Sequence, residues 1–168
     1  VAYGEVEYWK DGLLRAAFDR HRKQQRADLV RDLEDFRQRH RHWLDDFALF
    51  LALRRAHDGR AWYEWPRPLA FREPAALAEW ASAHRDELEL VVFCQFLFFR
   101  QWEAVRAAAL AEGVQILGDV PIFVARDSAD VWANPELFLL DDERRPTVVG
   151  GVPPDYFSAT GQLWGNPL

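Results

Sequence analysis

The feature that most constrains the fold of this chain is a change of pattern at Glu112-Gly113. Before this point, apolar residues recur at helical spacing over long stretches. After it comes a short β-branched run, Val114-Gln115-Ile116-Leu117-Gly118-Asp119-Val120. A helix, one glycine and then a buried strand make the helix-to-strand step of an α/β fold. The sequence therefore predicts an α/β protein, mostly helical over residues 1–113, with a strand over residues 114–120.

Helical spacing of apolar residues, delimited by Gly and Pro, predicts four helices, at about residues 13–36, 43–58, 74–83 and 87–112. Between the second and the third, Pro66 and Pro68 interrupt the aromatic-rich segment Trp62 to Pro68, which is predicted to be a loop. The helix over residues 87–112 is apolar around most of its circumference. We expect other parts of the protein to cover nearly all of it.

The region after the predicted strand is expected to be irregular and functional. Asp127 or Ser128 can cap a short helix. A short strand is predicted at Leu137 to Leu140, with a turn over residues 141–145. Residues 150–168 have no periodicity and hold four of the nine glycines and three of the nine prolines. A loop of that length is typically functional or disordered, and its aromatic residues argue against disorder.

Composition excludes several classes of protein. A chain of 168 residues with 49% hydrophobic and 29% charged residues has globular composition and fits one domain. The net charge is −6, and residues 114–168 alone hold eight acidic and three basic residues, so a nucleic-acid partner is not expected. No apolar run reaches the 18 residues of a membrane span. The single cysteine, Cys94, allows no internal disulfide and fits a cytoplasmic, reducing environment.

Most catalytic motifs are missing from the sequence. It has no glycine-rich phosphate loop and no serine nucleophile elbow, and its five histidines form no zinc motif. What remains in the last third is an acidic, amide and aromatic set: Asp119, Asp127, Asp130, Asp155, Tyr156, Phe157, Gln162, Trp164 and Asn166. Carboxylates and amides bind pairs of hydroxyls, and flat rings cover the apolar face of a sugar. Two other roles stay open: Asp119 could tie a turn, and the eight tryptophans could pack a core.

Several long strings in the sequence carry a family resemblance. They are residues 118–124 (GDVPIFV), 127–132 (DSADVW), 151–158 (GVPPDYFS) and 161–167 (GQLWGNP), with 62–66 (WYEWP) and 93–102 (FCQFLFFRQW) upstream. In order from about Trp43 to Leu168, they resemble the 4-alpha-glucanotransferases. This family is also called the amylomaltases or disproportionating enzymes, glycoside hydrolase family 77. The strings are long and compositionally unusual, which makes the resemblance specific.

The resemblance implies part of a (β/α)8 TIM-type barrel with inserted helices, incomplete in this chain, and an enzyme that needs no metal or organic cofactor. Such enzymes cut an α-1,4-glucan and transfer a segment to a new 4-hydroxyl, through a covalent intermediate on an Asp with a Glu as acid/base. In the family, these carboxylates follow the G-Q-x-W-G-N-P string. We therefore expect no catalytic residue in this chain, the nucleophile Asp and the acid/base Glu beyond Leu168, and no activity from these 168 residues alone.

The family's binding residues can be carried over to matching positions. Asp119 matches a strand-end aspartate near the attacked glucosyl unit, and Asp155, Tyr156 and Phe157 match a mobile loop over the glucan. Gln162 and Trp164 match the acceptor side. Packing roles are expected for the tryptophans at positions 62, 65, 102 and 132.

The resemblance also implies a set of partners and leaves two alternative functions open. The implied partners are α-1,4-glucans such as maltooligosaccharides, amylose and glycogen, with neither nucleic acid nor membrane. One alternative is a noncatalytic glucan-binding fragment. The other is a helical interaction protein in which the C-terminal segment is a docking tail.

Overall fold

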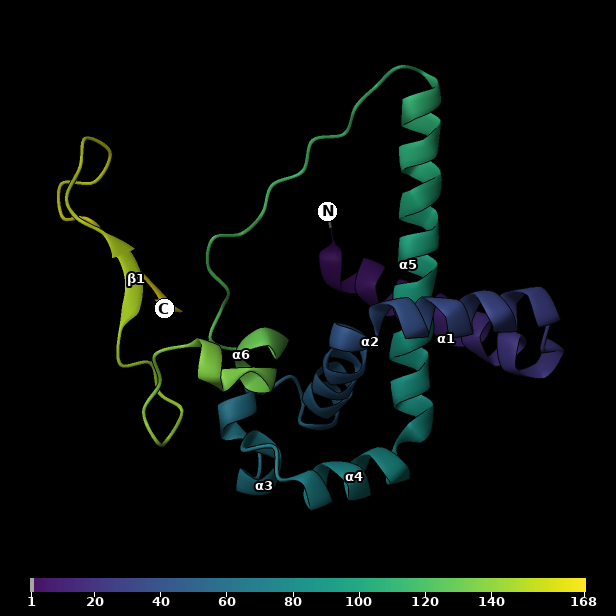
Figure 1. The fold of residues 1–168 in the computed structure, drawn as a ribbon, viewed down its shortest axis with the longest axis horizontal. Coiled ribbons are helices and arrows are strands. Elements are labelled where there is room, and N and C mark those ends of the chain that lie inside the picture. Colours follow the sequence, from purple (N-terminus) through teal and green to yellow (C-terminus); the bar gives the residue numbers. More distant parts are fainter. Residues whose placement is uncertain (1) are drawn as a thin grey trace. The chain divides into compact units, whose positions relative to one another are not determined.

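The computed structural model describes residues 2–168 and is rich in helix (Figure 1). Its helices are α1 (Tyr3–Gln24), α2 (Ala27–Ala56), α3 (Arg67–Ala70), α4 (Pro74–Ala83), α5 (Arg85–Ala111) and α6 (Ala129–Ala133). Its strands are β1 (Val149–Val152) and β2 (Gln162–Pro167), and short 3-10 helices lie at Trp62–Glu64 and Pro135–Leu137. The chain forms two compact units. The first comprises Val1–Ala48 and His84–Ile116, and the second comprises Leu49–Ala83 and Leu117–Leu168.

The predicted helices are present, but the first two have different boundaries: α1 begins at Tyr3, ten residues before the predicted start, and α2 begins at Ala27. Helices α4 and α5 lie where the sequence places them, and α2 ends at Ala56, just before the predicted stop. The break between the first two helices lies at Gln25 rather than after residue 36. Gln25 has the left-handed φ of 44°, and its N–H donates to the carbonyl of His21, which ends α1 with a C-terminal cap. None of the helices formed by residues 2–168 is long and apolar enough to cross a membrane.

The first unit packs α1 and the first part of α2 against α5. Phe18 of α1 lies 5.6 Å from Phe93, and Phe36 of α2 lies 5.8 Å from Phe96, measured between ring centroids. All four rings are buried. Ion pairs border this apolar contact, among them Arg15–Glu87 and Arg37–Glu89.

Helix α5 is covered less than its sequence predicts. Its buried residues lie in its first half, at Leu90–Phe93 and Phe96, where α1 and α2 pack. Further along, Phe98, Trp102 and Leu110 are 57%, 40% and 69% exposed. The expectations that nearly the whole circumference is covered and that Trp102 packs in a core are therefore wrong for this chain, because its other helices reach only the first half of α5.

The second unit is built around tryptophans. Trp62 and Trp132 are completely buried, and Trp65 is 4% exposed, so the packing role expected for these three is confirmed. Each indole N–H is also paired with a backbone carbonyl: Trp132 donates to Leu69 over 3.1 Å, and Trp62 donates to Arg126 over 2.7 Å. These bonds attach α3 and the loop before it to α6 and the segment before it.

The strand predicted over residues 114–120 does not form. Residues 112–128 form neither helix nor strand (Figure 1). Leu117 and Val120 are 91% and 81% exposed. A strand forms when a neighbour pairs with its N–H and C=O groups. No other part of residues 2–168 pairs with this segment as a strand, so its β-branched residues lack the partner that would make them a strand.

The long loop predicted over residues 150–168 is instead an antiparallel hairpin. Strand β1 pairs with β2, with Val152 opposite Gln162 and Gly151 opposite Leu163. The residues between the strands form its connecting loop. The short strand predicted at Leu137 to Leu140 is also wrong: a 3-10 turn ends at Leu137, and a single bridge joins Leu140 to Pro146 around the turn predicted at 141–145.

Candidate functional site

All six residues carried over from the family lie in the second unit. Asp119 lies on the segment of residues 112–128 and is exposed, and its Oδ1 accepts a hydrogen bond from the N–H of Val120 over 2.8 Å. One oxygen of the carboxylate is thus bonded to the local backbone, but residues 114–121 form no turn for it to tie. The second oxygen, Oδ2, is left to face solvent or a ligand.

The hairpin loop displays two aromatic rings. Oδ1 of Asp155 accepts hydrogen bonds from the backbone N–H of Phe157 (2.9 Å) and Ser158 (2.7 Å), which makes a tight side-chain turn. Tyr156 and Phe157, at the apex of this turn, are 97% and 92% exposed, with their rings 5.7 Å apart and nearly perpendicular. Asp155 therefore orders the loop, and the loop presents the rings outward.

Gln162 and Trp164 form a pair on β2. The indole N–H of Trp164 donates to Oε1 of Gln162 over 3.0 Å, which orients both side chains. The Trp164 ring is 47% exposed and lies 5.8 Å from the ring of Phe123 on the segment that carries Asp119. This arrangement can stack on the apolar face of a sugar ring and bond its hydroxyls.

A bulge in β2 joins the hairpin to the Asp119 segment. Val149 pairs with Pro167 and Gly151 pairs with Leu163, so residues 164–166 of β2 lie opposite Gly150 alone, two residues more than β1 has there. Gly165, in this bulge, has φ +77°, a value that favours glycine. Next to it, Nδ2 of Asn166 donates to the carbonyl of Val124 over 2.9 Å. Sequence reasoning placed Asn166 in a sugar site and gave Phe123 no role, although both lie in the quoted strings.

Two other acids from the sequence set have different environments. Asp127 holds the second unit together: Oδ1 accepts from the N–H of Trp62 (3.2 Å), and Oδ2 pairs with Arg54 (2.9 Å). Ser128, not Asp127, caps α6, since its Oγ accepts from the N–H of Val131. Asp130 lines an apolar pocket of about 440 Å³ that also includes Phe123.

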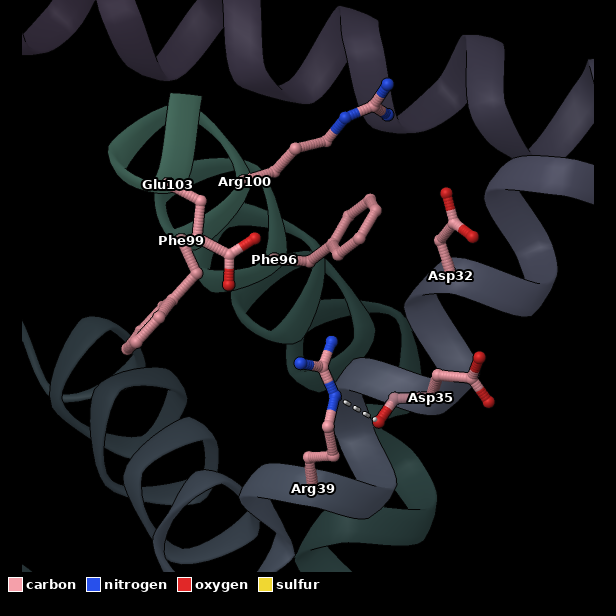
Figure 2. A pocket seen from close by; sticks show the side chains of 7 residues that line it. All are labelled: Asp32, Asp35, Arg39, Phe96, Phe99, Arg100 and Glu103. Atoms are coloured by element: carbon pink, nitrogen blue, oxygen red, sulfur yellow. Dashed lines mark hydrogen bonds between the residues drawn. The ribbon is translucent and has the colours of Figure 1, made fainter. Parts of the chain in front are cut away.

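A separate groove lies between α2 and α5 in the first unit (Figure 2). Its volume is about 290 Å³, and it is lined by Asp32, Asp35, Arg39, Phe96, Phe99, Arg100 and Glu103. All five charged side chains are exposed, and Arg39 donates only to the backbone carbonyl of Asp35. The groove contains none of the predicted site residues. Within residues 2–168, no group of three or more His, Cys, Asp or Glu is placed to hold a metal ion.

Comparison with known proteins identifies the family. A family model described as 4-alpha-glucanotransferase matches residues 1–168. The chain is 53% identical over 168 residues to a 4-alpha-glucanotransferase of Thermus thermophilus and 46% identical over 169 residues to one of Synechocystis. It also superimposes, with a TM-score of 0.91 and 36% identity, on an amylomaltase from Streptococcus agalactiae solved in complex with acarbose.

The chain therefore belongs to the 4-alpha-glucanotransferase family, as the resemblance of its strings predicts. In each of these three comparisons the whole of this chain is covered, together with 34% of the other protein. The chain spans about a third of the length of these relatives.

Proposed function

We propose that this chain is the substrate-binding part of a 4-alpha-glucanotransferase. The whole enzyme cuts an α-1,4-glucan and transfers the released segment to the 4-hydroxyl of an acceptor, with retention through two displacements. Its substrates are maltooligosaccharides, amylose and glycogen. Family membership supports this activity, and the amylomaltase relative was solved with acarbose bound. The catalytic Asp and Glu are contributed from outside residues 1–168, so these residues alone bind glucan without turning it over.

The observation that carries this proposal is the display of aromatic rings on the hairpin of the second unit. Two adjacent, almost fully exposed rings give the hairpin loop a flat apolar surface that the apolar face of a sugar can cover. Here the turn at Asp155 holds Tyr156 and Phe157 outward, while Trp164 is oriented by Gln162 on the adjoining strand. Rings at the tip cover the donor glucan, and the Trp164 ring receives the acceptor sugar.

The wider setting follows from the same proposal. The chain contributes to a (β/α)8 barrel with inserted helices, which its likeness to an amylomaltase supports. In that barrel, residues 114–120 gain strand neighbours, and 114–168 form the substrate-binding part beside the helical residues 1–113. The enzyme works in the cytoplasm, in keeping with a lone cysteine, and uses no metal or organic cofactor.

The test compares transfer with hydrolysis on maltotriose, in the protein expressed from its complete reading frame. Covering the site excludes water, the competitor that turns transfer into hydrolysis. We expect Tyr156→Ala and Trp164→Ala to lower transfer more than hydrolysis. Loss of a stacked ring weakens acceptor use by roughly 1–3 kcal/mol, by analogy with aromatic stacking on nucleobases. The products are separated and quantified as glucose and longer oligosaccharides.

The matched control is Tyr8→Ala, which removes an aromatic ring that is 85% exposed in the first unit. It is expected to keep the wild-type ratio of transfer to hydrolysis. Binding of maltooligosaccharides without turnover by the complete protein would support the noncatalytic alternative. If both hairpin variants keep the wild-type ratio, the roles assigned to Tyr156 and Trp164 are wrong.

A further inference from the structure

The segment that carries Asp119 has little structure of its own. Residues 114–128 form neither helix nor strand, and Asp119 bonds only to the next backbone N–H. A carboxylate on such a segment is held in place only if the chain nearby is attached to something rigid. The question is what sets the position of Asp119 relative to the aromatic hairpin.

The bulge of β2 provides the nearest attachment. The carbonyl of Val124, five residues after Asp119, accepts a hydrogen bond from Nδ2 of Asn166 over 2.9 Å. One residue earlier, the ring of Phe123 packs 5.8 Å from Trp164. The same ring also lies beside β1, 3.5 Å from where a Cβ on Gly150 would be, which is an ordinary van der Waals distance.

A second attachment lies further along the segment and points the same way. The indole N–H of Trp62 donates to the carbonyl of Arg126, and its backbone N–H donates to Asp127. The segment is thus fixed to the tryptophan core at 126–127. Asn166 then decides how the part closer to Asp119 lies against the hairpin.

We infer that Asn166 is a positioning residue that sets the Asp119 segment against the strand bearing Gln162 and Trp164. Its Nδ2 bonds the backbone carbonyl of Val124, so it acts on the reaction through the position of Asp119. The inference rests on the proposed function for its effect on catalysis, but the attachment itself does not. It also explains why a bulge is built here: with two residues more than β1, this part of β2 brings Trp164 against Phe123 and Asn166 against Val124.

The test replaces Asn166 by Asp, a side chain of the same shape that lacks the donor and turns an oxygen toward the Val124 carbonyl. The matched control is Asn134→Asp, because Nδ2 of Asn134 also donates to a backbone carbonyl in the same unit, that of Asp130. Both are made in the protein expressed from its complete reading frame. Asn166→Ala, which removes the donor without adding charge, serves as a second variant.

The first readout is a distance distribution measured by pulsed electron spin resonance. Spin labels are placed at Val120→Cys and Ala159→Cys, both exposed, with the other cysteines replaced by serine. We expect both Asn166 variants to broaden the distribution between the segment and the hairpin loop, and Asn134→Asp to leave it narrow. An unchanged distribution in the Asn166 variants overturns the inference whatever the activity.

The second readout is kinetic, on unlabelled protein with maltotriose. We expect Asn166→Asp to lower kcat/KM for transfer at least tenfold with little change in the thermal midpoint. In an Asp119→Asn background, the same substitution is expected to have little further effect, because both act through one carboxylate. A purely structural role would lower stability and give additive losses.

The outcomes separate the two proposals. A broadened distribution with full transfer activity overturns the positioning role. A broadened distribution in a protein whose wild type does not transfer glucan leaves the attachment standing and refutes the proposed function.

Discussion

Replacing Trp132 tests the tryptophan core of the second unit directly. The side chain is completely buried, packs with its ring centroid 5.8 Å from both Phe50 and Trp65, and lies beneath the guanidinium of Arg72. Removing a buried Trp side chain costs about 3–5 kcal/mol through lost burial and the cavity left behind. Trp132→Ala also leaves the Leu69 carbonyl without its 3.1 Å donor. For a protein of this length, the loss lowers the melting temperature by about 6–20 °C.

The assay is urea unfolding of the 168-residue chain followed by far-UV circular dichroism, with Trp102→Ala as the control. Both variants remove the same side chain, but Trp102 is 40% exposed, so its loss is expected to cost less than about 1 kcal/mol. Trp132→Phe separates the two effects: it keeps a ring but loses one hydrogen bond, at about 0.5–1.5 kcal/mol, because the Leu69 carbonyl still accepts from the N–H of Arg72. Equal midpoint shifts for Trp132→Ala and Trp102→Ala would refute the assignment of the core.

Three further predictions concern local features. Gly161→Ala is expected to disrupt the hairpin, because its Cβ would lie 2.5 Å from a carbonyl oxygen of β1. Gly165→Ala has open space around its Cβ, so we expect it to lose only the roughly 1–2 kcal/mol of stability that a positive φ costs a residue with a side chain, and thermal melts compare the two variants. Burial, with the positive charges of Arg39 and His42, lowers the pKa of His40 below 6.5. The stability that neutral His40 contributes is therefore complete above pH 6.5 and is lost as the pH falls through the lower folded pKa. NMR titration of His40 and urea midpoints at descending pH measure this, and an unchanged stability would contradict it. Glu87→Gln removes an exposed ion pair with Arg15 and should cost less than about 1 kcal/mol, with a smaller loss at high salt.

The helices could be predicted from the sequence because their signals are local. Apolar spacing and the residues that stop helices depend on near neighbours in the chain, so α4 and α5 were placed within a few residues. The break at Gln25 was missed, because a left-handed cap by a non-glycine residue carries no strong sequence signal. The cover of α5 was overestimated for a different reason. Apolar residues show which faces of a helix tend to be buried, but not whether a partner is present, and residues 2–168 cover mainly the first half of α5.

The strands could not be predicted as well, since pairing is not local. Residues 114–120 have strand composition but no neighbour, whereas residues 149–167 lack alternation and nevertheless pair. Their glycines explain the second case. A Cβ on Gly151 would lie 2.6 Å from the carbonyl oxygen of Gln162, so the two strands approach closely because a side chain is missing there. A pattern search for alternating apolar residues does not detect such a pair.

For the candidate site, the sequence points to residue types, and the structure adds which side chains contact which. The exposed rings at 156 and 157 and the turn at Asp155 are where the sequence placed a functional loop, although their binding of glucan stays a prediction. Asp127 had been grouped with the sugar-binding acids, yet its carboxylate is occupied by Arg54 and the backbone of Trp62. An Asp that binds sugar and an Asp that holds the fold together look the same in the sequence, and only the partners of the carboxylate in the structure distinguish the two roles.

The string Gly161 to Pro167 shows why an unusual sequence can be recognised before it is understood. Gly161 has φ +73° where the loop returns to β2, Gln162 orients Trp164, and Gly165 has the positive φ of the bulge. Asn166 then reaches a carbonyl 42 residues earlier in the chain. Each residue meets a different geometric requirement, so no single propensity scale explains the string, and we expect substitutions that preserve only polarity or size to disturb its geometry. The requirement on Asn166 becomes visible only when the position of the Val124 carbonyl is known. For that reason Asn166, which from its sequence alone is easily taken for a sugar ligand, is the residue that we assign to positioning.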